Sequence, residues 1–215
     1  MVPSYIFAIT LAFIVGVFSA VHPYTFGDYV LQALSYIGVS IPTFFFGLVL
    51  VIVFAVHFGW LPPSGMTSAS GSAGLGSRIA HLVLPVTVLT AFYLASESRY
   101  TRAAVLDVIR ADYIRTARAK GLPERTVLWR HAVRNALLPV VTVMILDGAY
   151  MFAGAVVTES VFAWPGMGRL FVQAVTQGDY PVLMVEVMLV AVAVVLANIV
   201  ADVLYAVLDP RVSLS

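Results

Sequence analysis

The residue types that support catalysis or metal binding are few and poorly spaced in this chain. It has 215 residues, no cysteine and four dispersed histidines. His57 and His81 flank one loop, but no carboxylate is placed to complete a metal site with them. Ser64, Ser70 and Ser72 lie in or beside the same loop, whereas a membrane-embedded nucleophile needs a serine in one helix facing a histidine in another. We therefore expect no catalytic residue, no bound metal and no cofactor.

A glycine-rich stretch gives the one hint of phosphate chemistry. Residues 71–78 read Gly-Ser-Ala-Gly-Leu-Gly-Ser-Arg, which approaches the phosphate-binding pattern G-x-x-x-x-G-K-[ST] of the Walker A motif. Ser77 stands where that pattern requires lysine, and no strand precedes the stretch. We interpret it as a flexible loop. The chain is predicted not to be an enzyme, so that any ATP hydrolysis would belong to partner subunits.

The composition indicates a membrane protein. Hydrophobic residues make up 61% of the chain and charged residues 11%, with a mean hydropathy of +0.97, whereas soluble domains carry about 25% charged residues. A compact soluble domain of this length has too little interior to bury so many apolar side chains. The net charge of +1 argues against a nucleic-acid partner.

Five apolar stretches are long enough to cross a bilayer as helices, which takes about 20 residues each. They are residues 3–21, 35–57, 80–97, 136–158 and 182–208. None shows the short alternating pattern of β-barrel strands. The sequence thus predicts an all-α integral membrane protein in which residues 1–215 form a single transmembrane domain.

Lysine and arginine residues mark one side of the membrane. Nine of them lie between residues 97 and 134 and Arg211 adds a tenth, whereas the loops on the other side hold only Arg78 and Arg169. Because such residues are enriched on the cytoplasmic side, the loop 98–135 and the C-terminus are expected in the cytoplasm. With five spans the N-terminus would lie outside, from which we expect a further helix upstream.

Acidic residues within the predicted spans are costly in lipid and should face a cavity or a partner. Asp147 is the most central of them, and two interpretations stay open. It lies either in a translocation path, where it meets the ammonium group of a peptide or another cation, or in a structural hydrogen bond to a neighbouring helix. Glu186 is expected close enough to the outer boundary to be solvated.

The basic loop 98–135 has the composition of ordered helices. Residues 99–119 favour one helix, Gly121 and Pro123 end it, and residues 126–138 predict a second. The apolar residues at helical spacing in the first are Ala103, Leu106, Ile109 and Tyr113. An apolar helix face can dock in the groove of a soluble partner. The alternative is a loop that rests on anionic lipid headgroups. Such a loop needs neither apolar residues at helical spacing nor a residue that ends the helix in its middle.

Two runs of sequence in this region are specific. Residues 112–122 read Asp-Tyr-Ile-Arg-Thr-Ala-Arg-Ala-Lys-Gly-Leu, and residues 131–139 read His-Ala-Val-Arg-Asn-Ala-Leu-Leu-Pro. Together they resemble the cytoplasmic loop of ABC-importer permeases, most closely the B-type permease of the dipeptide, oligopeptide and nickel group. Residues 40–44, 159–168 and 179–181 are similar to the same group, so the resemblance extends along the whole chain.

The resemblance implies a type I ABC importer permease fold in the bacterial inner membrane, with a translocation path for peptides or similar small solutes. It also implies partners: a second, non-identical permease subunit, two cytoplasmic ATPase subunits and an external solute-binding protein. The group has one more N-terminal helix, so this chain is expected to begin at the group's second span. Which solute is carried stays open.

The resemblance further implies that the helix of residues 112–121 sits in a cleft of one ATPase subunit and couples its motion to transport. The coupling residues would be Asp112, Tyr113, Arg115, Thr116, Ala117, Arg118, Lys120 and Gly121. Gly121 has a physical role of its own, because a turn between two helix pieces accepts a positive φ there without a side-chain clash.

A second group of residues is expected near the outer surface. The group comprises Trp164, Gly166, Gly168, Asp179 and Tyr180. Its aromatic residues fit an interfacial belt first, and contact with the solute-binding protein through the loop 159–181 second.

The rival interpretation is a secondary transporter or channel subunit driven by an ion gradient. Such a protein has no reason to carry a docking loop of 38 residues, and it usually contains inverted repeats, of which none is evident here. The energy source distinguishes the two interpretations.

Overall fold

The computed structural model describes residues 2–67, 74–151 and 155–208, which form helices and their connections with no strand among them. In chain order the elements are α1 (Val2–Val21), α2 (Phe26–Ser40), α3 (Thr43–Leu50), the π-helical η1 (Val51–His57), α4 (Leu75–Ile109), α5 (Asp112–Ala119), α6 (Glu124–Thr126), the π-helical η2 (Val127–Val133), α7 (Arg134–Tyr150), α8 (Val156–Val161), α9 (Met167–Gln177) and α10 (Tyr180–Leu208).

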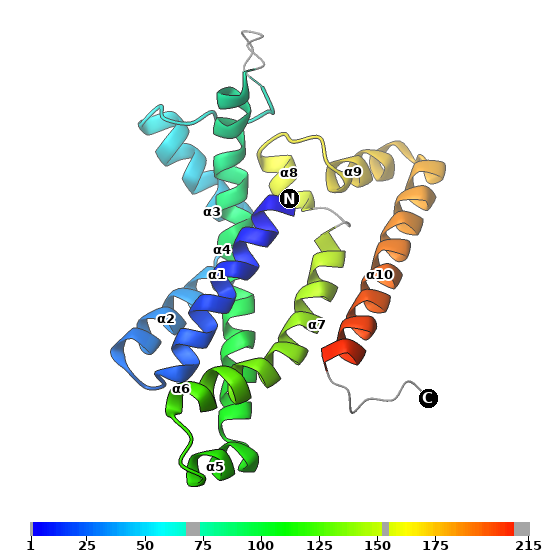
Figure 1. Cartoon of the computed structure of the whole chain (residues 1–215). Helices are drawn as coiled ribbons and strands as arrows, with labels where there is room; N and C mark the ends of the chain where they lie inside the picture. Colours follow the sequence, from blue (N-terminus) through cyan, green and yellow to red (C-terminus); the bar gives the residue numbers. More distant parts are fainter. Residues whose placement is uncertain (1, 68–73, 152–154, 209–215) are drawn as a thin grey trace.

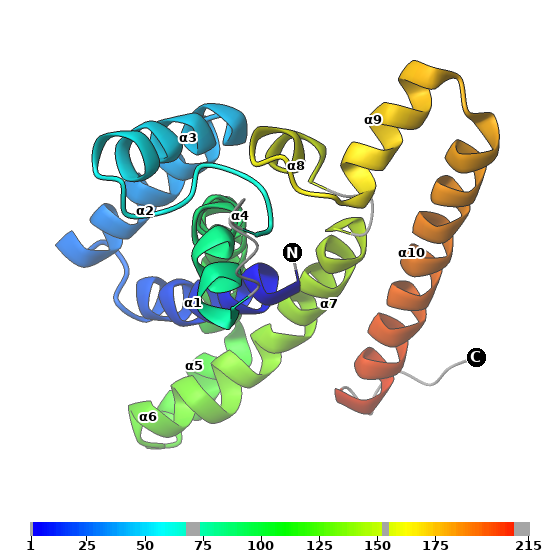
Figure 2. The same cartoon turned by 90° about the horizontal axis from the view of Figure 1, so that it is seen from above.

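Within the described ranges, four helices are long and apolar enough to cross a membrane: α1, α4, the run from α6 through α7, and α10. A fifth span results if α2 and the α3–η1 segment count together. The long α4 stands at the centre with α1 across it (Figure 1). Seen from above, α10 lies apart from the α1–α4 bundle, next to α7 and α9 (Figure 2). The prediction of an all-α membrane protein with about five spans is confirmed.

Helix boundaries differ from the predicted spans in several places. The predicted span 136–158 is divided, because α7 ends at Tyr150 and residues 156–158 belong to α8. The stretch 35–57 is bent by 98° between α2 and α3. Its cause is Pro42, because a proline pushes the preceding residue out of the helical region, and Ile41 is extended (φ −83°, ψ 121°). In addition, α4 continues beyond Glu97 to Ile109, so that residues 98–109 of the predicted loop belong to this helix.

Some predictions fall on residues outside the described ones. They concern residues 152–154 of the predicted span 136–158, the C-terminal residues 209–215, and residues 71–73 of the glycine-rich stretch.

Small residues let α1 lie directly on α4. Ala8, Ala12, Gly16 and Ala20 recur every fourth residue, which places them on one face, and all four are buried. A Cβ atom on Gly16 would lie 2.6 Å from the Cβ of Thr101, so no side chain fits at this crossing. Membrane helices associate through such faces, because van der Waals packing replaces the hydrophobic drive that lipid removes.

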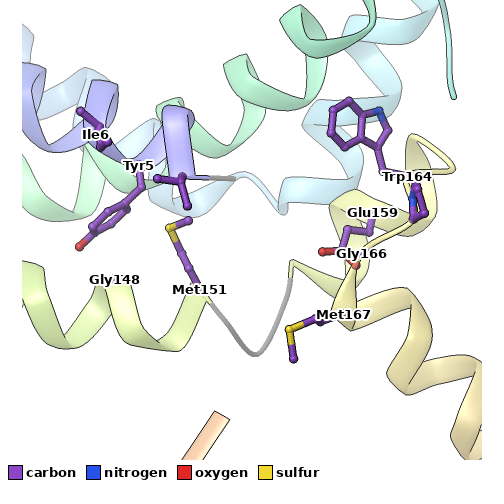
Figure 3. Close-up of a pocket in the computed structure, with 10 residues that line it drawn as sticks. Tyr5, Ile6, Gly148, Met151, Glu159, Trp164, Gly166 and Met167 are labelled. Atoms are coloured by element: carbon purple, nitrogen blue, oxygen red, sulfur yellow. The ribbon is translucent and has the colours of Figure 1, made fainter. Parts of the chain in front are cut away.

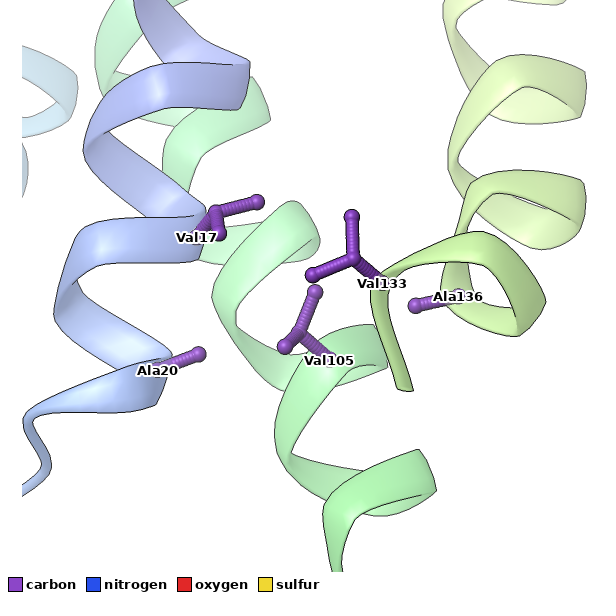
Figure 4. Packing of buried hydrophobic residues seen from close by; sticks show 5 residues of the cluster. All are labelled: Val17, Ala20, Val105, Val133 and Ala136. Carbon is purple, nitrogen blue, oxygen red and sulfur yellow. The ribbon is translucent and has the colours of Figure 1, made fainter. Parts of the chain in front are cut away.

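A cluster of buried residues joins α1, α4 and the beginning of α7. It consists of Val17, Ala20, Val105, Val133 and Ala136, which point toward one another (Figure 4). Since α4 leads into the loop and α7 leaves it, this cluster fixes the two helices on either side of α5.

A buried ion pair ties the beginning of α2 to α4. The Asp28 carboxylate is fully buried and accepts two hydrogen bonds of 2.8 Å from the Arg102 guanidinium. It also accepts hydrogen bonds from the hydroxyl of Ser19 and, at 2.9 Å, from the backbone N–H of Tyr24. Sequence analysis counts Arg102 among the charges of the basic loop. In the structure, Arg102 instead forms an ion pair with Asp28 inside the helix bundle.

Candidate functional site

The candidate site predicted for a partner protein is α5, which follows α4 after a sharp break. Ala111 is extended (φ −66°, ψ 147°), so α4 ends at Ile109 and α5 begins at Asp112. The single helix predicted over 99–119 is therefore wrong at this point. An acid in the first turn favours a new helix start at Asp112, because it faces the positive end of the helix dipole.

The apolar face of α5 points into its own chain. Ile114 and Ala117 are buried against Val127 and Ala132 of η2, at the end of α4. Their spacing of three residues places both on one side of the helix. The predicted apolar face for a partner's groove is thus corrected: the chain covers its own apolar face, and the predicted face residues Ala103 and Tyr113 are exposed.

The outward face of α5 is polar. Asp112, Tyr113, Arg115, Thr116 and Lys120 are exposed there. Asp112 and Arg115 stand 3.7 Å apart with both side chains in solvent, a pair worth little in stability. The Tyr113 hydroxyl accepts a hydrogen bond of 3.1 Å from the Asn135 side chain, which links the start of α5 to α7. The structure thus presents most of the predicted coupling residues together on one solvent-facing surface.

Arg118 and Gly121 shape the turn that follows α5. The Arg118 guanidinium donates to both carboxylate oxygens of Glu124, at 3.1 and 2.7 Å, and this bond lowers the pKa of the Glu124 carboxyl. Gly121 has φ +75°, as its place between two helices predicts, and its N–H donates to the Arg118 carbonyl at 2.9 Å. Of the predicted coupling residues, Arg118 is engaged within the chain and Ala117 is buried.

At the other end of the molecule a cavity of about 440 Å³ opens between α1, the end of α7 and the connection from α8 to α9. Tyr5, Ile6, Gly148 and Met151 lie on one side of it, and Glu159, Trp164, Gly166 and Met167 on the other (Figure 3). Two of the five predicted outer residues, Trp164 and Gly166, therefore line a common cavity with mostly apolar walls.

Glu159, which sequence analysis did not single out, organises this connection. Its carboxylate accepts a hydrogen bond of 2.8 Å from the Arg169 N–H, one of the donors that the first turn of α9 leaves unpaired. Gly166 lies so close to the Glu159 carboxyl that a Cβ atom would overlap it, and a Cβ on Gly168 would lie 2.7 Å from the Val156 backbone. An acid seven residues before a Gly-x-Gly was the available signal.

Asp179 and Tyr180 belong to a different corner. Gly178 ends α9 with φ +68°, and Asp179 accepts a hydrogen bond of 3.2 Å from the Val182 N–H, which caps the start of α10. Tyr180 is 72% exposed. Neither residue lines the cavity that holds Trp164 and Gly166.

Asp147 lies half-buried on α7, with the carboxyl of Glu97 from α4 beside it. Sequence analysis takes Glu97 as the end of a span, but Glu97 lies inside α4 and is 1% exposed. The four-residue spacing of Glu97, Thr101 and Val105, all buried, was the signal for a continuing helix face. A neighbouring acid on another helix favours the structural interpretation of Asp147, and the path role stays a prediction.

One further acidic residue of a spanning helix is buried. Glu186 of α10 is 4% exposed, so the expectation that water solvates it is wrong. The Glu186 carboxyl lies close enough to Glu159 to interact with its charge. Within residues 2–67, 74–151 and 155–208, no three His, Cys, Asp or Glu side chains stand close enough to hold a metal ion.

Comparison with known proteins gives consistent relatives along the whole chain. The oligopeptide transport system permease protein AppB of Bacillus subtilis (strain 168) is 46% identical over 212 residues, 99% of this chain and 67% of its own length. The di/tripeptide transport system permease protein DppB of Pseudomonas aeruginosa is 40% identical, over 96% and 67% respectively. The glutathione transport system permease protein GsiC of Escherichia coli (strain K12) is 39% identical, over 98% and 66%. This chain spans about two thirds of the length of these relatives.

A solved structure has the same fold. It is the crystal structure of an amino acid ABC transporter with histidines, at a TM-score of 0.61 and 14% identity, covering 98% of this chain and 89% of that one. The family model described as binding-protein-dependent transport system inner membrane component matches residues 12–214. With this match and relatives of 39–46% identity, the chain belongs to the family of binding-protein-dependent transport system inner membrane components.

Proposed function

We propose that this chain is a membrane-spanning permease subunit of an ATP-driven ABC importer that carries peptides or similar small solutes. The names of its relatives support the solute class, since they are permease proteins for oligopeptides, di- and tripeptides, and glutathione. Its partners would be a second, non-identical permease subunit, two ATPase subunits and an external solute-binding protein.

The observation that carries the proposal is the construction of α5. Its apolar residues, Ile114 and Ala117, are covered by the chain itself, and its polar side faces solvent between α4 and α7. A helix built in this way offers a rigid, charged surface to a soluble protein. In the proposed complex Arg115 and Lys120 pair with acidic residues of an ATPase subunit, which fixes the register of docking more than its affinity.

The proposed orientation places the loop 98–135 and the C-terminus in the cytoplasm. Arginine and lysine residues support this side, because they gather on α5, α6 and the helix ends next to them. Arg118 then acts within the chain, where its bonds to Glu124 brace the turn at Gly121. The docking residues proper are those that remain exposed, Asp112, Tyr113, Arg115, Thr116 and Lys120.

The opposite end is the proposed contact surface for the solute-binding protein. Tyr180, exposed at the corner between α9 and α10, is its most accessible aromatic residue, and Trp164 lies at the cavity. Gly166, Gly168 and Asp179 would act indirectly, because they hold the shape of α8, α9 and α10. For Asp147 we propose the structural role beside Glu97, with a place in the translocation path as the alternative.

The proposal is tested by charge reversal on α5. Arg115→Glu is introduced into the tagged full-length subunit, which is purified from membranes in mild detergent, and the accompanying proteins are identified by mass spectrometry. We expect the second permease subunit to be recovered as before and the ATPase subunits to be strongly depleted. Arg78→Glu is the matched control, since it reverses an equally exposed arginine at the far end of α4 and should retain the ATPases.

Equal recovery of ATPase subunits with both variants would contradict the role of α5. Uptake that persists without any ATPase and collapses with the ion gradient would establish the secondary transporter instead.

A further inference from the structure

Glu97 is a carboxyl group deep in the helix bundle without a hydrogen-bond donor. The residue is 1% exposed, and neither of its side-chain oxygens has a hydrogen-bond partner among the described residues. An ionised carboxylate accepts hydrogen bonds and donates none, and a buried charge that is neither paired nor hydrogen-bonded is strongly disfavoured. The ionised form of Glu97 therefore does not suit its surroundings.

The group that Glu97 meets is a second acid. The Asp147 carboxyl of α7 stands at hydrogen-bonding range of it, and no lysine, arginine or histidine acts on Glu97 there. The other titratable groups that face the pair are Tyr5 of α1 and Tyr93 of α4. The Tyr5 hydroxyl donates to the Met144 carbonyl, and its ring packs edge-on against Tyr93 at 4.9 Å, so it is not free to donate to the acids.

Two carboxylates at this range repel each other, and the repulsion is strong away from water. One proton removes both difficulties. It halves the charge of the pair, and it supplies the donor that the Glu97 oxygens lack. An O–H to carboxylate hydrogen bond is also among the strong, short hydrogen bonds of proteins.

We propose that Glu97 and Asp147 form a proton-binding site, in which the two carboxyl groups share one proton and so join α4 to α7. The site lies on the two helices that flank the α5 loop, further from that loop along α4 and α7 than the cluster of Val105, Val133 and Ala136. The hydrogen-bonded pair is a second contact that holds α4 and α7 together, in addition to the apolar cluster. Its hydrogen bond breaks if the two helices separate. This inference does not depend on the transported solute.

The test is infrared spectroscopy of the full-length subunit, purified with the subunits that accompany it and placed in lipid nanodiscs. A protonated carboxyl group has a carbonyl stretching band distinct from carboxylate bands, and the band shifts in heavy water. We expect such a band at neutral pH in the wild-type protein, and we expect one component of it to be lost both in Glu97→Gln and in Asp147→Asn. Glu186 is a second buried acid whose carboxyl oxygens have no hydrogen-bond partner among the described residues, so Glu186→Gln should remove only its own contribution and leave the component that Glu97→Gln and Asp147→Asn remove.

Loss in both single variants is the signature of a shared proton, because each variant removes one half of the same hydrogen bond. Survival of that component in either variant would overturn the proposal, and so would a wild-type protein with no protonated carboxyl band at neutral pH. The wild-type measurement needs no variant to fold. In the wild-type protein that component should also disappear when the pH is raised, and its persistence unchanged in Glu97→Gln at every pH would count against the pair.

Discussion

The two ends of the molecule are built on opposite principles. At the α5 end, the apolar side chains of α5 are buried against η2, and the polar groups that hold the helices are paired, Arg102 with Asp28 and Arg118 with Glu124. At the α9 end, the walls of a cavity of about 440 Å³ include one oxygen of Glu159 and the indole N–H of Trp164, neither of which has a hydrogen-bond partner among the described residues.

The difference concerns what each end can do when a partner binds. A surface with satisfied contacts beneath it moves as one body, so a force on α5 reaches α4 and α7 with little lost to local rearrangement. An end with open volume and unpaired polar groups has alternative arrangements of similar energy. The proposed function assigns docking of the ATPase subunit to the first end and contact with the solute-binding protein to the second.

The largest effect is expected from breaking the buried ion pair at the α5 end. Arg102→Leu leaves the fully buried Asp28 carboxylate without its partner, which should cost roughly 3–5 kcal/mol of stability. Thermal unfolding of the detergent-purified subunit, followed by loss of the monodisperse peak in size-exclusion chromatography, measures the change. Arg99→Leu is the control, because Arg99 is exposed and lies 4.4 Å over the Tyr36 ring, a contact worth about 0.5–1 kcal/mol. Equal losses in the two variants would contradict the role of burial.

The next effect tests the close packing of α1 on α4, which supports both ends. Gly16→Ala places a Cβ atom 2.6 Å from the Cβ of Thr101 and 2.7 Å from the Ser98 carbonyl oxygen, and such overpacking costs about 1–3 kcal/mol. The same chemical change at Gly76 meets nothing within 4 Å and replaces glycine in a helix, so it should stabilise by roughly 0.5–1 kcal/mol. Melting temperatures that move in opposite directions would support the helix contact, and a harmless Gly16→Ala would refute it.

A smaller effect on stability, with a larger one on transport, is expected at the turn after α5. Gly121 has open space around it but φ +75°, so Gly121→Leu is strained by its backbone, at a cost of about 1–2 kcal/mol. We expect this variant to reach the membrane and to show less uptake for each ATP hydrolysed in proteoliposomes. Gly121→Asn, which tolerates a left-handed backbone, should retain most of the coupling, and failure of both variants alike would point to the side chain.

The smallest effect concerns the exposed pair of Arg118 and Glu124. Because Arg118 lowers the pKa of the Glu124 carboxyl, the pair stabilises the folded protein above the usual titration range of glutamate, and the contribution is lost as the pH falls through the lowered pKa. For an exposed pair it should not exceed about 1 kcal/mol. The stability difference between wild type and Glu124→Gln, measured from neutral to acidic pH, should shrink on acidification, and a difference that grows would contradict this sign.

Features that depend on neighbouring residues were predictable from the sequence. The lengths of the apolar runs predict about five spans, Gly121 predicts a positive φ, and Pro42 marks the place where α2 and α3 meet at an angle. The resemblance of residues 112–122 and 131–139 to permease loops leads to the family that the comparisons show.

Contacts between distant residues were not predictable in the same way. Periodicity indicates that a side chain is buried, but it does not say which residue faces it. Arg102 therefore counts as a free loop charge until the fold brings Asp28 to it from 74 positions away. For the same reason the apolar face of α5 is expected to serve a partner, although Val127 and Ala132 of its own chain cover it. Because sequence analysis takes Glu97 as the end of a span, it does not predict that Glu97 lies beside Asp147 inside the helix bundle.

The length of α4 has a mechanical consequence. Its 35 residues, Pro85 among them, form one continuous helix of about 52 Å, long enough to run from one face of the membrane to the other. A tilt of about ten degrees, applied where α5 is attached, would displace the opposite tip by about 9 Å. The helix thus converts a small angular movement on one side of the membrane into a larger displacement on the other, where α4 packs through Leu84 and Val88 against Phe162 at the end of α8.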